Sequence, residues 1–394
     1  MIDAPALDPV AAVAPPVAPF IRDADSLATL VGSLLRAPRL ALDTEFMRER
    51  TYLAELALLQ LCDGGTPALV DPLAGLDLQP LMACLADPGR TKVLHAARQD
   101  LEVLLPLTGQ PLAPVLDTQV AAALAGHAPQ VGYGELVFKE LGVALEKGQA
   151  RTDWLRRPLS LAQSTYAADD VRYLLPLAGR LLARLGELGR LGWLAEETAA
   201  LADPRLYTVD PATAWQRLKG IEACPPREQA RLQALAAWRE SRALRRNLPR
   251  SWVLADDLLR EIGRRAPANL DALRALQLLQ ERTLDKLGDE IMAALAVGEA
   301  AAIDGLVQRL DTRPSATEKA MAARLSNTLK TVGAAYQLAP ELLATQRELR
   351  VLARAAVGPE ATPGQEPAGL PCLRGWRRAV VGERLLASRA EIFS

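Results

Sequence analysis

RLALDTEF (residues 39–46) and LALLQLC (residues 56–62) are the two stretches that decide the fold. Each is an apolar run of strand length, and the turn signal DGG (residues 63–65) leads from the second run into a third, PALV (residues 67–70). Three short apolar runs joined by brief turns predict an antiparallel meander. We therefore expect a sheet in the front part of the chain.

Helical spacing of apolar residues surrounds these runs. It is found in residues 23–35 and 98–107, and it dominates residues 117–185. A further buried strand, TKVLH (residues 91–95), precedes the second of these helices. Strands with helices between and after them predict an α/β layer fold. From about residue 210 onward amphipathic helices continue without a convincing strand, so we expect an all-α back half.

The length of 394 residues predicts two or three domains. Half of the residues are hydrophobic, and because no apolar run reaches the ~18 residues of a membrane span, we expect a soluble protein. The first twenty residues contain Asp but no Lys or Arg, unlike a secretory signal, and predict a flexible leader over residues 1–19. The cysteines lack paired spacing, which indicates neither a zinc site nor a disulfide framework and favours a reducing cytoplasm.

Carboxylates are the candidate metal ligands, because the chain has only two histidines. Asp43 and Glu45 stand two apart at the end of the first strand, so both side chains point to one face and can converge on one cation. For an isolated Asp-x-Glu, a polar strand end is the commoner explanation. Asp100 begins a helix after the strand TKVLH, where α/β proteins collect site residues, although an acid there also favours the helix dipole.

Tyr166 and Asp170 are four residues apart in a helical stretch and therefore share a face. Ala167 and Ala168 let this helix approach the sheet. Asp169 is rotated by ~100° from that face, and we expect it to point to solvent. Four carboxylates suit a pair of Mg²⁺ or Mn²⁺ ions ~4 Å apart, which favours phosphodiester hydrolysis, with Tyr166 orienting or deprotonating the attacking water.

Three motifs together resemble those of the DEDDy group of exonucleases: LDTEF (residues 42–46), HAARQDLE (residues 95–102), and Tyr166 with Asp170. The segments RTY, LQL, LDTQ and RTDWL resemble ribonuclease D in the same order. The likeness spans roughly residues 20 to 200, and ordered matches are more specific than any single motif.

The resemblance implies an α/β RNase H-like exonuclease domain, a mixed sheet flanked by helices. It implies a ribonuclease D-like 3′-to-5′ exoribonuclease that releases nucleoside 5′-monophosphates and trims the 3′ ends of tRNA precursors and other structured RNAs. It also implies that two divalent metal ions bind to the four acids and that the tyrosine orients the water. The implied catalytic residues are Asp43, Glu45, Asp100, Tyr166 and Asp170.

Two other acids and one histidine compete for a place in the site. Asp117 and Asp153 each precede a helical run, and for both we favour the capping of a free amide. His95 lies on a buried strand, where a hydrogen-bonded core histidine is the commoner explanation, although a place near the substrate stays open.

The back half resembles the HRDC domains of ribonuclease D, most clearly in AWQRLKGI, LQALAAWRESRALRR and NLPRSWV between residues 214 and 253. Residues from about 316 resemble a second such module more weakly. A basic stretch in the first module could contact RNA phosphates, with a solvated helix face as the alternative. Its members are Arg239, Arg242, Arg245, Arg246 and Arg250. The expected domains are the exonuclease domain (20–205), an HRDC domain (206–295) and a second HRDC-like helical domain (296–394).

Two other functions stay open on the residues alone. A DNA-directed 3′-to-5′ exonuclease would use the same acids, and only contacts to the 2′-hydroxyl separate RNA from DNA. A noncatalytic nucleic-acid-binding protein with a decayed exonuclease fold is opposed by the presence of all five motif residues. We expect RNA 3′ ends as partners, with no membrane and no obligate protein partner.

Overall fold

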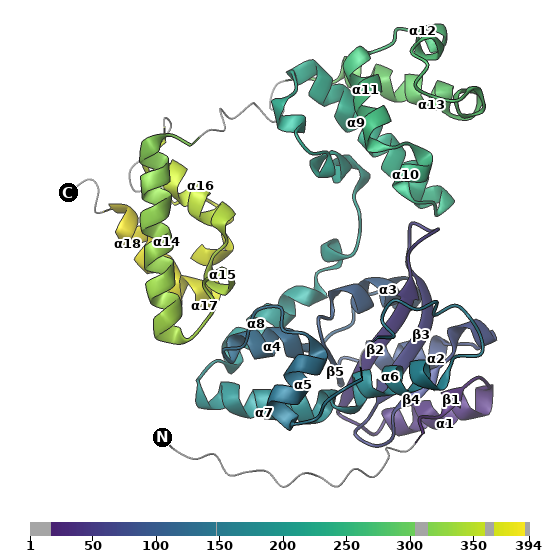
Figure 1. Ribbon diagram of the computed structural model, residues 1–394, viewed down its shortest axis with the longest axis vertical. Helices are drawn as coiled ribbons and strands as arrows, with labels where there is room; N and C mark the ends of the chain where they lie inside the picture. Colours follow the sequence, from purple (N-terminus) through teal and green to yellow (C-terminus); the bar gives the residue numbers. More distant parts are fainter. Residues whose placement is uncertain (1–16, 147, 304–313, 359–365, 391–394) are drawn as a thin grey trace.

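The structure is a computed structural model that describes residues 17–146, 148–303, 314–358 and 366–390. Figure 1 shows a sheet-containing part at the front of the chain and two helical parts after it. Residues 1–16 of the expected leader lie outside the described ranges. The expected α/β front and helical back are confirmed, whereas the domain boundaries stay predictions.

The front part forms one six-stranded mixed sheet. Its strands are β1 (Phe20–Ile21), β2 (Arg39–Met47), β3 (Glu55–Cys62), β4 (Ala68–Val70), β5 (Thr91–Leu94) and β6 (Val115–Asp117). The spatial order is β1-β4-β3-β2-β5-β6. β2, β3 and β4 pair antiparallel, which confirms the meander, while β1 pairs parallel with β4 and β5 pairs parallel with β2 and β6. β1 and β6, of two and three residues, were not expected from the sequence.

Helices cover both faces of this sheet (Figure 1). They are α1 (Ala24–Leu34), α2 (Gln79–Ala86), α3 (Arg98–Thr108), α4 (Thr118–Leu124), α5 (Tyr133–Leu141), α6 (Leu161–Arg172), α7 (Leu174–Glu187) and α8 (Leu191–Ala199). Successive strand residues point to opposite faces. Leu42 and Leu59 therefore pack with α1, α2 and α3, whereas Ala41 and Leu58 pack with α6 and α7.

The first helical module has its own apolar core, which includes Leu232, Leu235 and Ile291. Its helices are α9 (Pro226–Arg246), α10 (Arg250–Val253), α11 (Asp256–Arg265), α12 (Leu270–Ala275) and α13 (Glu281–Ala300). The tip between β2 and β3 contacts this module: the Asn247 side-chain oxygen accepts the backbone N–H groups of Tyr52 and Leu53 at 3.1 and 3.0 Å.

The C-terminal module consists of α14 (Ala316–Tyr336), α15 (Pro340–Leu343), α16 (Gln346–Val357), α17 (Gly375–Arg377) and α18 (Glu383–Ala390). Short 3-10 turns occur along the chain at η1 (Pro72–Ala74), η2 (Ala200–Ala202), η3 (Pro204–Leu206), η4 (Pro211–Arg217), η5 (Ile221–Ala223) and η6 (Pro371–Leu373), with a π turn at η7 (Arg378–Gly382).

The buried hydrophobic residues of the C-terminal module belong to one hydrophobic cluster with those of α4, α5, α7 and α8. At this junction the rings of Trp193 and Trp376 stack with centroids 4.6 Å apart. The module therefore packs directly onto the exonuclease domain.

The apolar character of the helices suits packing against other protein elements. Within the described ranges, no helix is both long enough and apolar enough to pass through a bilayer.

Candidate active site

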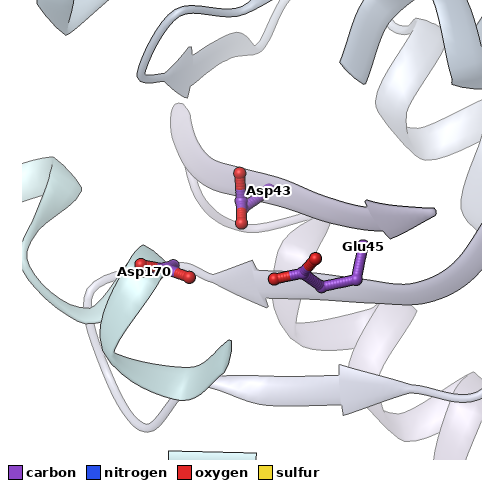
Figure 2. Close-up of side chains that lie close together, drawn as sticks. All are labelled: Asp43, Glu45 and Asp170. Atoms are coloured by element: carbon purple, nitrogen blue, oxygen red, sulfur yellow. The ribbon is translucent and has the colours of Figure 1, made fainter. Parts of the chain in front are cut away.

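Three acids meet where α6 crosses the sheet. Asp43 and Glu45 come from one face of β2, and Asp170 comes from α6, so that one oxygen from each lies within 4.8 Å of the others. Figure 2 shows the three carboxylates pointing toward one another. Ala167 and Ala168 are fully buried against the sheet, and these small side chains let the helix come close.

Asp100 lies next to this group, in the first turn of α3, and is buried. One of its carboxylate oxygens accepts a 2.5 Å hydrogen bond from the hydroxyl of Thr44. Thr44 stands between Asp43 and Glu45 on β2, so this bond ties α3 to the strand that carries two of the acids. The structure thus brings all four sequence-predicted acids to one region.

The four carboxylates repel one another inside the protein. Burial, followed by the charges of Asp100, Asp170 and Glu45, raises the pKa of Asp43 well above its ordinary value. Burial is also the largest cause for the other three, and raises the pKa of Glu45 to about 9, of Asp170 to about 7 and of Asp100 to about 6. A bound cation would reverse this penalty, and an oxygen-only donor set suits a hard divalent ion. The residues therefore fit a hard divalent cation.

Tyr166 lies one turn before Asp170 on α6, and the two groups are close enough to shift each other's pKa. Its ring packs against Trp154 with centroids 6.1 Å apart. Burial and then the neighbouring acids raise its pKa far above that of an ordinary phenol. Of the two roles expected for Tyr166, orienting a water therefore fits better than deprotonating it, because the phenol keeps its proton near neutral pH.

Asp169 differs from its prediction. Instead of pointing freely to solvent, its carboxylate accepts a 2.9 Å hydrogen bond from Arg172, and most of its side chain is covered.

A cleft lies beside this part of α6. Its lining residues are Leu145, Glu146, Gln149, Ala162, Thr165, Tyr166, Asp169 and Asp170.

Asp117 caps the first turn of α4, as expected, by accepting the N–H groups of Gln119 and Val120. It also accepts the N–H groups of Ala96 and Ala97, at 3.0 and 2.9 Å. Ala96 adopts a left-handed backbone with φ 58° at the bend between β5 and α3. Asp117 therefore also fixes the bend that sets Asp100 in place. This role gave no local signal, because its partners lie about twenty positions earlier in the chain.

The other two competitors behave as hydrogen-bonded structural residues. His95 contacts the Thr118 hydroxyl and the Val131 carbonyl through its two ring nitrogens, each at 3.0 Å. Asp153 accepts the backbone N–H of Leu155 at 3.1 Å. Both observations agree with the preferred explanations.

The five arginines of the first module have different environments. Arg239 is 3% exposed, and its guanidinium donates to the Leu254 carbonyl and to Asp256. This burial corrects the expectation that Arg239 contacts phosphate, since the side chain holds α9 to the start of α11. Arg242 is bound to Glu290, and Arg250 lies 3.8 Å from Glu240. Arg245 and Arg246 are exposed.

Two family models match the chain in the order of its parts. The model described as 3′-5′ exonuclease covers residues 19–186, and the model described as HRDC domain covers residues 228–295. The first match contains every proposed catalytic residue. The second contains the five arginines discussed above.

Similar proteins extend the likeness to nearly the whole chain. Ribonuclease D of Gluconacetobacter diazotrophicus is 41% identical, with 93% of this chain and 92% of the relative covered. Ribonuclease D of Pseudomonas paraeruginosa is 38% identical, with 95% and 98% covered. The crystal structure of Escherichia coli RNase D, an exoribonuclease involved in structured RNA processing, matches with a TM-score of 0.82 at 33% identity, and 95% of this chain and 99% of that chain are covered.

Proposed function

The chain belongs to the ribonuclease D family of 3′-to-5′ exoribonucleases, and from this premise we propose that four acids form its metal site. These are Asp43, Glu45, Asp100 and Asp170. The observation that carries the proposal is the convergence of Asp43, Glu45 and Asp170 from two separate elements. Oxygen ligands of this charge suit Mg²⁺ or Mn²⁺, and we propose that two such ions bind.

The proposed reaction removes nucleotides one at a time from an RNA 3′ end. Bound divalent ions would activate the attacking water and stabilise the leaving 3′ oxygen. Tyr166, kept protonated by its surroundings, orients that water. The water oxygen forms a bond to phosphorus while the bond from phosphorus to the 3′ oxygen of the preceding nucleotide breaks. The products are a nucleoside 5′-monophosphate and an RNA that is one nucleotide shorter with a free 3′-hydroxyl.

The test is a hydrolysis assay of matched RNA and DNA strands labelled at the 5′ end, with Mg²⁺, with Mn²⁺ and with EDTA. We expect a ladder of shortened RNA products with either ion, 5′-monophosphates as the released product, and no turnover in EDTA. Faster digestion of the DNA strand would show that the DNA-directed alternative is correct. Full activity in EDTA would contradict the metal mechanism.

We propose structured RNAs as the substrates, and tRNA precursors in particular. The support is the role of the similar Escherichia coli enzyme in structured RNA processing. A comparison of tRNA precursors carrying extended 3′ ends with unstructured RNAs of equal length tests this choice. If the precursors are trimmed no faster than the unstructured strands, RNA remains the substrate class, but the proposed preference for tRNA precursors is wrong.

The proposed RNA contacts of the first module centre on the exposed Arg245 and Arg246. Arg242 and Arg250 stand close to acids, which reduces the charge they can offer to phosphate. Trp252 is 60% exposed on the adjacent α10, and an exposed indole beside arginines suits the stacking of an unpaired base. Together these residues would hold a single-stranded segment of RNA near the catalytic domain.

We propose that the protein works in the cytoplasm without an obligate protein partner. The cysteines lack the paired spacing of a disulfide framework, which suits a reducing compartment. Activity of the purified chain alone in the hydrolysis assay tests the second part. Fractionation of cells that produce the protein tests the first.

A further inference from the structure

Gln60 lies in the middle of β3, on the sheet face that carries the acids. Its direct neighbours on the adjacent strands are Asp43 of β2 and Leu69 of β4. Residues opposite each other in antiparallel strands share a face. Leu58, two positions earlier, packs against α6 on that face. Gln60 therefore lies beside Asp43 on the sheet face that α6 covers.

The side chain of Gln60 is 0% exposed, and neither its amide nitrogen nor its amide oxygen has a hydrogen-bond partner. A buried amide without partners destabilises the folded state, and an apolar residue of similar size would avoid that cost. The neighbouring Leu58 and Leu69 are apolar and fully buried, so the surroundings favour such a residue. The amide at this position therefore has a use other than the stability of the metal-free fold.

A second unpartnered group lies on the same face. Within the described part of the exonuclease domain, the buried side-chain atoms without a partner belong to Gln60 and to Trp154, whose indole N–H is one of them. Trp154 packs in the same cluster as Leu69, the β4 neighbour of Gln60, and its ring lies against Tyr166. An ionised Asp43 carboxylate only accepts hydrogen bonds, so the amide nitrogen is the part of Gln60 that can bond to it.

We propose that Gln60 is a positioning residue for the metal site, whose amide nitrogen donates a hydrogen bond to the carboxylate of Asp43 when a divalent cation is bound. This inference rests on the proposed metal site. A carboxylate that binds a cation through one oxygen keeps a lone pair for a second partner, and such a partner fixes the orientation of the ligand. An ionised acceptor also makes the bond stronger than one between neutral groups.

The test uses the full chain with the apolar, similarly sized variant Gln60→Met, and Mn²⁺ alone as the probe. Thermal unfolding is followed in EDTA and along an Mn²⁺ titration. We expect Gln60→Met to melt at or above the wild-type temperature in EDTA, while the Mn²⁺ concentration at half of the full stabilisation rises roughly 10-fold or more. A merely structural glutamine would instead lower the melting temperature in EDTA and leave the Mn²⁺ midpoint in place, which overturns the proposal.

Gln229 supplies the matched control. It is a buried glutamine of the first helical module whose side-chain oxygen also lacks a partner. Gln229→Met should leave the Mn²⁺ midpoint unchanged. If the wild type itself shows no Mn²⁺-dependent stabilisation, the proposed metal site is wrong; if the wild type responds and Gln60→Met matches its midpoint, only the role of Gln60 is wrong.

A crystal structure of the wild type with Mg²⁺ gives a second measurement that does not depend on how a variant folds. The proposal requires the Gln60 amide nitrogen to lie within about 2.7–3.2 Å of an Asp43 carboxylate oxygen. A separation too long for a hydrogen bond in the metal-loaded protein would overturn it.

Discussion

Tyr166 keeps its phenolic proton because burial and the neighbouring acids raise its pKa. Tyr166→Phe retains the ring that packs against Trp154 but removes the hydroxyl that would orient the water. We expect kcat to fall by ~10²-fold or more with RNA binding nearly unchanged, which is the usual scale for a group that handles a proton. Single-turnover rates and equilibrium RNA binding measure the two quantities separately.

Tyr207→Phe is a suitable control for this change. The Tyr207 hydroxyl donates to the Leu201 carbonyl at 2.6 Å, and the ring is buried in the main core of the exonuclease domain. Removing this hydroxyl should lower stability slightly without a large effect on kcat. Equal rates for Tyr166→Phe and the wild type would mean that ions and acids orient the water alone.

Glu45 makes the metal-free protein sensitive to pH in an unusual direction. Its pKa rises from 4.5 to about 9 on folding, so between these values the folded state binds more protons than the unfolded state and stability falls as pH rises. Glu45→Gln removes this loss. In EDTA at pH 8 the variant should melt higher than the wild type, on a scale of about 2–4 °C per kcal/mol for a domain of this size.

Lowering the pH to about 5 should reduce this difference in melting temperature, because Glu45 is then protonated in the folded wild type at little cost. Saturating Mg²⁺ should also reduce it, since the ion stabilises the ionised wild-type site. An advantage of Glu45→Gln that is the same at pH 5 and pH 8 would contradict the assigned repulsion.

At the scale of single residues, the sequence predicted the acids, which can be recognised by their type and spacing. It missed residues whose role depends on what they contact in the folded protein. Asp43 and Glu45 were predicted because strand alternation places both on one face. Gln60 was not, since a glutamine within an apolar strand gives no sign that it faces a carboxylate on the next strand. Arg239 was misassigned because its burial depends on α11, which contacts α9 only after the module folds.

The bend between β5 and α3 depends on one carboxylate from another element. Asp117 accepts four backbone N–H groups. Asp117→Asn keeps one acceptor oxygen but replaces the other with a donor, so at least one of these N–H groups loses its acceptor. We expect a loss of about 1–3 kcal/mol in the free energy of unfolding, measured by urea denaturation. Activity should fall as well, because this bend sets the position of Asp100.

Asp153→Asn provides the comparison for the Asp117 variant. Asp153 accepts a single hydrogen bond at an exposed position, so its loss should change stability by only about 0.5 kcal/mol. Equal effects of the two substitutions would show that Asp117 is an ordinary cap.

Elements with a clear apolar period were predictable, and those defined by pairing were not. β2 and β3 are eight or nine residues long and show their character in the sequence. β6 has three residues and exists because the parallel edge of β5 receives it. Such a strand is a property of the sheet, which the local sequence does not encode.

At the scale of the whole molecule, our proposal assigns the chemistry to the exonuclease domain and additional RNA contacts to the first helical module. Arg245 and Arg246 lie on the first helical module, outside the carboxylate domain, and are exposed. Changing both to Gln should weaken the binding of long RNA and reduce the slope of log affinity against log salt by ~0.7 for each lost phosphate contact on a single strand. KM for long RNA should rise while kcat on a short oligonucleotide stays unchanged, as steady-state kinetics on the two substrates can measure.

Arg264 and Arg265 serve as the control pair, since they belong to the same module and are already paired with Glu261. Changing both to Gln removes the same formal charge and should leave the salt slope nearly unaltered. If the two double variants behave alike, RNA senses only the net charge of the module.

The order of domains was predictable, but their contacts were not. Trp376 and Arg377 form an aromatic and basic pair at the surface of their own module, yet the structure turns both toward the exonuclease domain, where Trp376 stacks on Trp193 and Arg377 pairs with Glu197. Which side chains meet at this junction depends on the shapes of the two folded domains, which the local sequence does not show.

The hydrophobic cluster shared by the C-terminal module and α4, α5, α7 and α8 also affects how the protein is made. Synthesis runs from the N-terminus, so the ribosome releases the catalytic domain long before α14 exists. Domains fold as units during synthesis, and exposed apolar surface makes unfinished chains prone to aggregate. The C-terminal module is thus translated after the domain whose apolar flank it covers. A chain whose synthesis stops before α14 would leave that flank exposed to solvent, as a surface of the kind that chaperones bind.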